Sequence, residues 1–242
     1  MNPVRNSPVG GRIAKWPARL GRASNGVKTS KKAVIFVNGD LADPSRIKKH
    51  IDKRTLIIAA DGGAAHALAL GITPHVVIGD FDSISAKMRR ALKKRGVQLI
   101  KHPRDKVHTD SGLALTLAKE RGCREILITG IRGTNTDHFL GNLFLLAKKK
   151  FVSSRITIVE GREEMIVVRK KVRIEGKKED TISLIAHGGR ARGITTKGLF
   201  YPLKNALIRA GSSRGIRNHM TGRNAEISVR SGALLIIHCF NS

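Results

Sequence analysis

The sequence predicts an α/β protein, with a parallel β-sheet that carries helices on both faces and a smaller all-β sandwich after it. In residues 33–150, short apolar runs alternate with helical patterns, as in sheets whose parallel strands are buried on both faces. In residues 151–242, short runs with apolar residues at every second position are separated by glycine-rich turns, which is typical of sandwiches. Residues 1–32 hold eight Lys and Arg, no acid, and several prolines and glycines, so we expect a disordered basic tail there.

The α/β part divides into strands and helices in a regular order. Apolar runs that end at a glycine or a polar residue predict five strands, at residues 33–39, 55–63, 75–80, 98–103 and 125–130. Helical periodicity between them predicts four helices, at residues 64–71, 85–96, 109–122 and 137–150. The third helix opens at Thr109 or Asp110, and the last carries three lysines at its C-terminal end, where the helix dipole is negative.

The rest of the chain is expected to consist of strands. Residues 155–171 have the pattern of a hairpin that turns at Gly161 and Arg162. Further strand-like runs follow at residues 172–187, 191–203, 225–232 and 233–240. We therefore divide the chain into the basic tail (1–32), an α/β domain (33–150) and a β-sandwich domain (151–242).

Acidic residues stand where the predicted strands end, at Asp61, Asp80, Asp82, Asp110 and Asp137. In a parallel sheet, ligands bind outside the carboxyl ends of the strands, so these side chains should converge. Carboxylates held together repel one another unless a cation lies among them. Oxygen ligands favour Mg²⁺, which usually brings substrate phosphates with it. The alternatives are helix capping by Asp110 or Asp137 and a simple turn at Asp61.

Glycines and basic residues near the same strand ends suit a phosphate group. Five glycines allow the backbone to come close to a ligand there: Gly62, Gly63, Gly79, Gly130 and Gly133. The sequence contains neither the P-loop motif nor the dinucleotide-binding motif. Lys106, His108 and Arg132 are either positive charges for a polyphosphate or ordinary surface residues. His138 is either a base or a structural hydrogen-bonding residue.

The formal net charge of +28 is spread along the chain, with +8 in the tail and +10 in each domain. Basic proteins often bind nucleic acid, but aromatic residues make up only 4% of this chain, too few for base-stacking platforms. Cys123 and Cys239 lie far apart without metal-type spacing. No apolar run approaches the roughly 20 residues that a membrane helix needs. We therefore expect a cytoplasmic protein with reduced thiols and neither membrane nor nucleic-acid partners.

Several long motifs resemble one enzyme family. The stretch ADGGAAHALALGITPHVVIGDFDSI resembles the signature of thiamine pyrophosphokinases, and the resemblance continues through HTDSGLALTLA, TDHFLGNLFLL, GITTKGLFYPL and GSSRGIRN. It covers roughly residues 33–240. It implies an α/β domain for ATP and Mg²⁺, a β-sandwich that helps bind thiamine, and a homodimer with active sites between subunits. The implied reaction moves a diphosphate from ATP to the hydroxyl of thiamine and releases AMP.

The resemblance also implies roles for individual residues. The catalytic positions are Asp61, Asp80, Asp82 and Asp110, of which Asp80, Asp82 and Asp110 are the expected metal ligands. The residues expected to contact ATP are Lys106, Thr109, Arg132, Asp137 and His138. The residues expected to approach thiamine are Ser212, Ser213 and Asn218.

Four positions depart from the family's pattern. Asn135 stands where the family usually has arginine, and Val107 stands where it favours an acid. Arg217 replaces a usual serine, and His219 replaces a common glutamate. Because thiamine carries a positive thiazolium, an arginine facing it would weaken binding. One alternative is therefore a diphosphokinase for another alcohol, such as a hydroxymethylpterin. The other, which rests on the net charge of +28, is a basic nucleic-acid-binding protein on an inactive fold.

Overall fold

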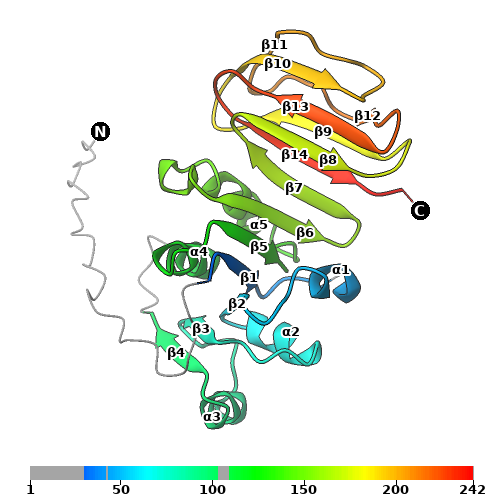
Figure 1. The fold of residues 1–242 in the computed structure, drawn as a ribbon. Helices are drawn as coiled ribbons and strands as arrows, with labels where there is room; N and C mark the ends of the chain where they lie inside the picture. The colour runs from blue at the N-terminus through cyan, green and yellow to red at the C-terminus, as the bar shows by residue number, and fades with distance from the viewer. Residues whose placement is uncertain (1–29, 42, 103–108, 242) are drawn as a thin grey trace, which may run out of the picture.

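The computed structural model describes residues 30–41, 43–102 and 109–241, and the strands of this part form two sheets (Figure 1). The larger sheet has ten strands in the order β12-β9-β14-β7-β6-β5-β1-β2-β3-β4. The smaller one has four, in the order β11-β10-β13-β8. Most of the expected tail (1–32) lies outside the described residues, and the first described strand begins at Lys32.

The parallel part of the large sheet contains the five strands predicted for the α/β part and also the first strand of the hairpin that was assigned to the sandwich. Its members are β1 (Lys32–Phe36), β2 (Leu56–Ala60), β3 (Val76–Gly79), β4 (Gln98–Lys101), β5 (Glu125–Thr129) and β6 (Arg155–Glu160). Each pairs in parallel with its neighbour, for example Ile35 with Ile58 and with Ile128. Nearly every residue of β1, β2, β3 and β5 is buried. This is why their sequences read as continuous apolar runs rather than alternating ones.

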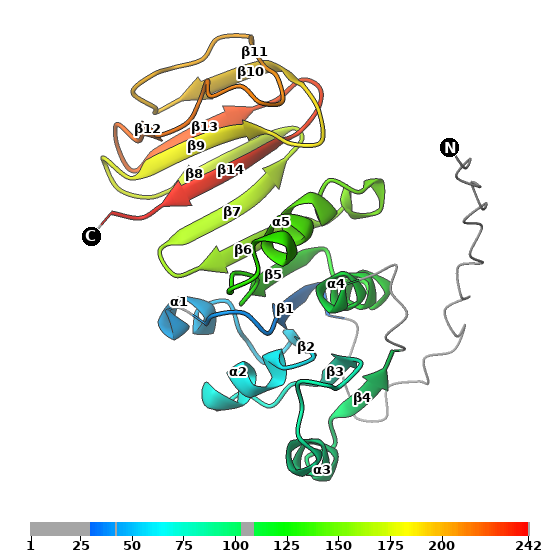
Figure 2. The ribbon, with the colours of Figure 1, turned by 180° about the vertical axis from the view of Figure 1, so that it is seen from behind.

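Helices cover both faces of this parallel sheet (Figures 1 and 2). One face carries α1 (Pro44–Lys48), α2 (Gly63–Ala69) and α3 (Ala86–Lys94), and the other carries α4 (Asp110–Glu120) and α5 (Thr136–Leu145). The two sets of core side chains come from alternate strand positions. Phe36 packs with Ile47 of α1, whereas Ile35 packs with Leu115 of α4. The predicted α/β class is confirmed.

Two details of the helices differ from the sequence prediction. The helix expected to run to Lys150 ends at Leu145, and a short 3₁₀ turn, η1 (Lys149–Phe151), follows it. The three lysines therefore lie beyond the helix and not in its last turn. Helix α1 was not predicted, because a helix of five residues that begins at Pro44 is too short to show a helical period.

The C-terminal strands extend the large sheet and add the second one. The hairpin turns at Gly161 and Arg162 as predicted, with Glu160 opposite Glu163 on β7 (Glu163–Val168). Beyond β7 the large sheet continues as β14 (Leu234–Cys239), β9 (Thr181–Ala186) and β12 (Asn218–His219). The small sheet contains β8 (Lys171–Glu175), β10 (Ala191–Lys197), β11 (Ala206–Ile208) and β13 (Asn224–Ser228).

The two sheets enclose an apolar core, which makes the C-terminal part a small antiparallel sandwich. Ile194 of β10 and Ile227 of β13 pack there against Leu184 of β9 and Ile236 of β14. The large sheet, however, runs across residue 150 without a break, because β6 pairs with β5. The domain division at that residue stays a prediction.

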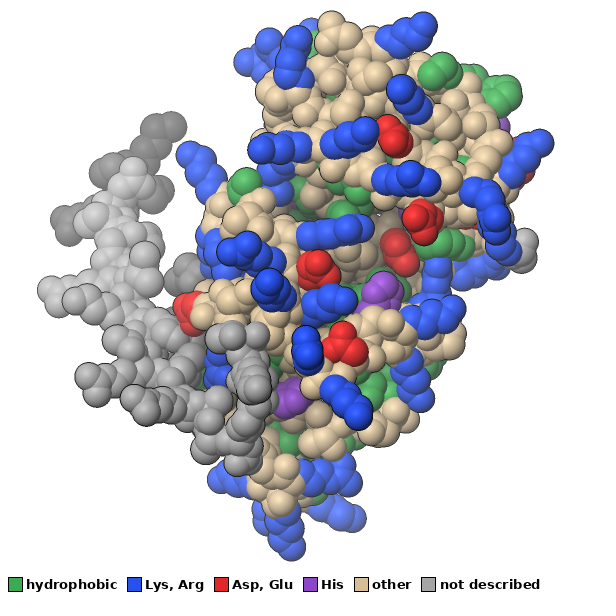
Figure 3. Space-filling model, in the orientation of Figure 1, with side chains coloured by type: hydrophobic (Ala, Val, Ile, Leu, Met, Phe, Trp, Pro, Cys, Tyr) green, Lys and Arg blue, Asp and Glu red, His purple; other side chains and the backbone are tan. Residues whose placement is uncertain are grey.

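Basic side chains are spread over the face seen in Figure 3 rather than gathered in one place. Figure 3 shows lysine and arginine side chains over the visible face, from the α3 end of the molecule to the small sheet, with a few acids among them. This agrees with the even spread of charge along the sequence. No helix among the described residues is long and apolar enough to cross a membrane.

Candidate active site

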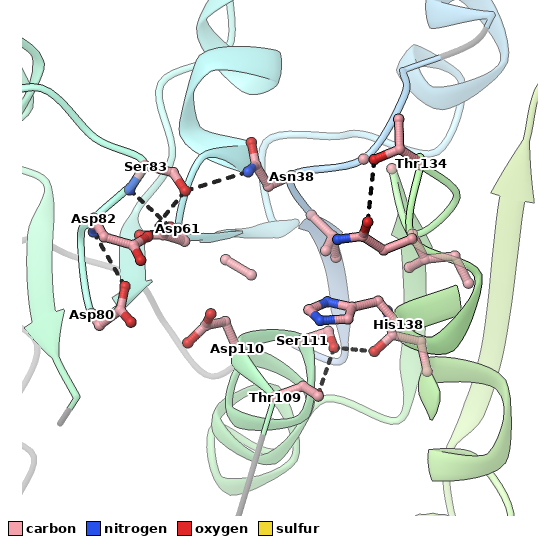
Figure 4. A pocket seen from close by; sticks show the side chains of 18 residues that line it. Asn38, Asp61, Asp80, Asp82, Ser83, Thr109, Asp110, Ser111, Thr134 and His138 are labelled. Atoms are coloured by element: carbon pink, nitrogen blue, oxygen red, sulfur yellow. Dashed lines mark hydrogen bonds between the residues drawn. The ribbon is translucent and has the colours of Figure 1, made fainter. Parts of the chain in front are cut away.

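A cavity of about 570 Å³ opens at the carboxyl ends of the parallel strands (Figure 4). Its walls come from the loops after β1, β2, β3 and β5 and from the first turns of α4 and α5. Six of the residues predicted from the sequence line it: Asp61, Asp80, Asp82, Thr109, Asp110 and His138. Four of the five acids expected to converge therefore line one cavity, and the fifth, Asp137, does not line it.

Asp61 holds the loop that carries the other two acids. It is 5% exposed and follows β2 directly. Its Oδ1 accepts a hydrogen bond from the backbone N–H of Phe81 at 3.0 Å, and its Oδ2 accepts one from the N–H of Ser83 at 3.3 Å. Burial raises the pKa of Asp61, hydrogen bonds from Ser83 lower it, and the negative Asp82 raises it further.

Asp80 and Asp82 complete an acidic cluster with Asp61. One ligand oxygen from each of the three lies within 4.8 Å of the others. Within the loop, Asp80 Oδ1 accepts the N–H of Asp82 at 3.2 Å, and the Ser83 hydroxyl donates to Asp82 Oδ1 at 3.1 Å. Carboxylate oxygens at this spacing fit a hard divalent cation.

Asp110 lies in the first turn of α4 and points toward the cavity (Figure 4). The neighbouring Thr109 caps the helix, since its Oγ1 accepts the N–H of Gly112 at 3.2 Å. Ser111 contacts both the Thr109 hydroxyl and Asn142 Oδ1 of α5. The sequence left open whether Thr109 or Asp110 caps this helix, and the structure assigns the cap to Thr109 and leaves the Asp110 carboxylate at the cavity.

The loops after β1 and β5 pass so close together that side chains are excluded. The N–H of Gly39 donates to the carbonyl of Gly130 at 2.7 Å. A Cβ atom on Gly39 would lie 2.1 Å from the carbonyl oxygen of Arg132, and one on Gly130, whose φ is 73°, would lie 2.5 Å from that of Val37. Glycine is required at both positions, so backbone groups form this wall of the cavity.

The other residues expected to contact ATP are placed differently. The guanidinium of Arg132 lies 2.6 Å from the carboxylate of Glu163, and Arg132 does not line the cavity. Asp137 is exposed in the first turn of α5, where it accepts the N–H of His138. Asn135 lines the cavity. Lys106, Val107 and His108 lie outside the described residues.

Comparisons with known proteins identify the family. A family model for the thiamin pyrophosphokinase catalytic domain matches residues 47–159, and one for the vitamin B1 binding domain matches residues 166–234. A thiamine pyrophosphokinase of Bacillus subtilis is 33% identical over 191 residues, which cover 78% of this chain and 89% of that protein. The chain belongs to the thiamin pyrophosphokinase family.

Solved structures of other thiamine pyrophosphokinases have the same fold. The crystal structure of the Bacillus subtilis enzyme matches 88% of this chain and all of that one, with a TM-score of 0.78 and 30% identity. The Geobacillus thermodenitrificans structure matches 87% of this chain and 98% of that one, with a TM-score of 0.75 and 26% identity. The yeast structure, at 18% identity and a TM-score of 0.68 over 88% of this chain and 87% of that one, supports the fold alone.

The residues expected to approach thiamine lie in the sandwich of this family member, away from the cavity. Ser212 and Ser213 are in the segment between β11 and β12, and Asn218 begins β12. Asn218 is 4% exposed, and its side-chain amide accepts the N–H of Tyr201 at 3.0 Å and donates to the Tyr201 carbonyl at 2.8 Å. It therefore holds the turn that carries exposed Phe200 and Tyr201.

The strand-end prediction missed five polar residues that line the cavity: Asn38, Ser83, Ser111, Thr134 and Asn142. Asn38 follows β1 and lies 3.5 Å from the Ser83 hydroxyl, so it links two strand ends. The rule that found the aspartates also applies to Asn38 and Ser83, because both follow buried strands. Asn142 had no such signal, since its approach to Ser111 depends on how α5 packs against α4.

Proposed function

We propose that this protein transfers a diphosphate group from ATP to the hydroxyl of thiamine and releases AMP. The observation that carries the proposal is the acidic cluster that lines a glycine-walled cavity, in a chain of the thiamin pyrophosphokinase family. Diphosphoryl transfer depends mainly on positioning the reactants and on neutralising phosphate charge. The glycine walls suit a polyphosphate, and the aspartates suit the cation that accompanies it.

We propose Asp80, Asp82 and Asp110 as the ligands of Mg²⁺, with Asp61 close enough to Asp80 and Asp82 to share the site. The ion supplies charge neutralisation and orientation of the phosphates when it is bound. Asp61 has a second task, because its hydrogen bonds set the shape of the loop that presents Asp80 and Asp82. One of the cavity carboxylates is the natural acceptor for the proton of the thiamine hydroxyl.

We propose that Thr109, Asp137 and His138 contact ATP, together with Arg132 and Lys106. Support is strongest for Thr109 and His138, which line the cavity. Arg132 would have to leave Glu163 to reach a phosphate. We further propose that a second copy of the chain brings Ser212, Ser213 and Asn218 to the thiamine, since in one copy they lie in the sandwich. The unpaired thiols of Cys123 and Cys239 agree with a cytoplasmic enzyme.

One observation favours a different acceptor alcohol. Arg217 precedes Asn218 and carries its positive charge next to the proposed acceptor segment, where it would repel the thiazolium of thiamine. A neutral heterocyclic alcohol such as a hydroxymethylpterin meets no such repulsion.

The test is to incubate purified protein with ATP, Mg²⁺ and either alcohol, and to measure AMP. AMP formation with thiamine supports the main proposal, and AMP formation with the pterin alone replaces the acceptor. Absence of AMP with both, together with nucleic-acid binding that weakens steeply with salt, would support the inactive-fold alternative.

A further inference from the structure

A buried glutamate at the end of β6 holds the loop that follows β5. Glu160 is the last residue of β6 and is 5% exposed. Its Oε1 accepts a hydrogen bond from the backbone N–H of Ile131 at 2.7 Å. Residue 160 lies between the stretches that match the two family models.

Glu163, which lies opposite Glu160, holds the same loop through the side chain of Arg132. Glu163 faces Glu160 across the turn of the β6–β7 hairpin, and its carboxylate pairs with the guanidinium of Arg132 at 2.6 Å. Arg132 also lies over the ring of Phe139 in α5, 5.2 Å from its centre. The hairpin thus contacts the loop at two successive residues. Glu160 hydrogen-bonds the backbone of Ile131, and Glu163 pairs with the side chain of Arg132.

The loop after β5 forms one wall of the proposed nucleotide cavity. Gly130, Ile131 and Gly133 line that cavity. The carbonyls of Gly130 and Arg132 accept the N–H groups of Gly39 and Asp40 at 2.7 and 2.5 Å, so the loop also fixes the segment after β1. A shift of the loop would therefore move two walls of the cavity together.

We infer that Glu160 is a positioning residue for the nucleotide: its carboxylate fixes the loop after β5 in the conformation that binds ATP. The inference rests on the proposed function in that it takes the cavity to be the ATP site. Glu160 itself does not line the cavity, so its effect is exerted through Ile131.

The ionisation of Glu160 offers a way to observe this role. Burial raises the pKa of Glu160 to about 7, although the N–H of Ile131 and the charge of Arg132 act against the rise. The charged groups of the elements around it are Arg132 and Glu163, together with Arg46, whose guanidinium is 3.4 Å from the Gly161 carbonyl and 4.0 Å from Glu164. A carboxylate accepts the Ile131 N–H more strongly than a carboxylic acid does. ATP affinity should therefore increase as the pH rises through neutrality.

The first measurement follows the Ile131 backbone amide by NMR in the whole protein without ligand. We expect its resonance to titrate with a midpoint at about 7 in the wild type and to stay constant in Glu160→Gln, which keeps an acceptor oxygen but cannot ionise. Glu175→Gln, an exposed position on β8, is the matched control and should titrate like the wild type. An Ile131 resonance that does not titrate in the wild type, or titrates equally in Glu160→Gln, overturns the inference.

The second measurement is calorimetric titration with ATP and Mg²⁺, without thiamine, between pH 6 and pH 8. The terminal phosphate of ATP titrates in the same range, so each value is compared with that of Glu160→Gln in the same buffer. We expect the wild type to gain about three- to tenfold in affinity relative to the variant as the pH rises, the size of the typical net contribution of one hydrogen bond. Identical pH profiles, or no ATP binding by any variant, overturn the inference.

The two proposals fail in distinguishable ways. If ATP binding shifts as expected but no AMP appears with thiamine, the proposed acceptor is wrong and the role of Glu160 stands. If AMP appears and Glu160→Gln binds ATP with the wild-type pH profile, the enzyme assignment stands and the role of Glu160 is wrong.

Discussion

The carboxylate of Asp61 accepts the backbone N–H of Phe81 at 3.0 Å, and both residues are in the left-handed region, with φ of 47° and 65°. Such conformations cost of order 1–3 kcal/mol each in non-glycine residues, so the surrounding structure must enforce them. The hydrogen bond between the two residues helps to hold both of them in this conformation. The loop with Asp80 and Asp82 therefore depends on Asp61 for its shape.

Asp61→Asn should test whether Asp61 sets the shape of the loop that carries Asp80 and Asp82. Asparagine keeps one acceptor oxygen but places an NH₂ group against a backbone N–H. We expect a loss of about 1–3 kcal/mol in the free energy of unfolding, measured by urea denaturation. We also expect weaker Mg²⁺ dependence of turnover. Asp43→Asn is the control, because Asp43 also has a positive φ, of 54°, but lies away from the cavity. Equal effects of the two variants would contradict the bracing role.

Replacing Asp80 and Asp82 together by alanine should abolish turnover and leave the fold intact. Removing two of three clustered carboxylates relieves charge repulsion, so the melting temperature should stay the same or rise. AMP formation should fall by about 1000-fold or more, because the charge neutralisation of the phosphates is lost. Glu175→Ala should leave both quantities unchanged. Substantial residual turnover in the double variant would rule out a metal site at these residues.

Arg217→Ser should strengthen thiamine binding. Arg217 has a φ of 55°, and its N–H donates to the Ser183 hydroxyl at 3.0 Å, which fixes the backbone beside Asn218. Removing the cation should lower the KM for thiamine by about three- to tenfold, as expected for a partly solvated like charge. Arg214→Ser, an exposed position in the same segment, is the control. A KM that rises in Arg217→Ser would show that the arginine recognises an acceptor other than thiamine.

The titration of Glu160 should be visible in the pH dependence of the free energy of unfolding. Its pKa is about 7 in the folded protein and lower in the unfolded chain, where the ordinary value is 4.5. Between these values the folded state binds more protons, so its contribution to stability is present below about pH 4.5 and is lost as the pH rises through 7.

Glu160→Gln removes this pH-dependent contribution to the free energy of unfolding. Between pH 5 and pH 8 the free energy of unfolding of the variant should therefore increase relative to that of the wild type, by at most about 3 kcal/mol. Denaturant melts at several pH values measure the difference, and a constant difference across this range would contradict the raised pKa.

The sequence carried most of the information about the parallel sheet and its acids. Buried parallel strands read as apolar runs, and their carboxyl ends share one edge, so Asp61, Asp80 and Asp82 could be grouped without coordinates. Glu160 could not be found in this way. It reads as the polar end of a strand before a turn, and its burial depends on pairing of β6 with β5, about 30 residues earlier in the chain.

The sandwich shows a second limit of sequence reasoning. Asn218 stays a proposed thiamine contact, but the sequence did not predict that its amide hydrogen-bonds both backbone groups of Tyr201, 17 residues away. Whether a buried amide serves a ligand or a distant turn is decided by tertiary packing. Period-two patterns give the strands but say nothing about that packing.

The unbroken run of the large sheet through both halves of the molecule bears on how the protein unfolds. A cut near residue 150 would leave β5 as an open edge and take from β6 its only parallel neighbour among the described strands. Neither fragment would keep the backbone hydrogen bonds between β5 and β6. We therefore expect the two halves to melt in one cooperative transition, and proteases to release no stable half. A chimera that takes its C-terminal half from a relative would therefore have to preserve the pairing of β5 with β6.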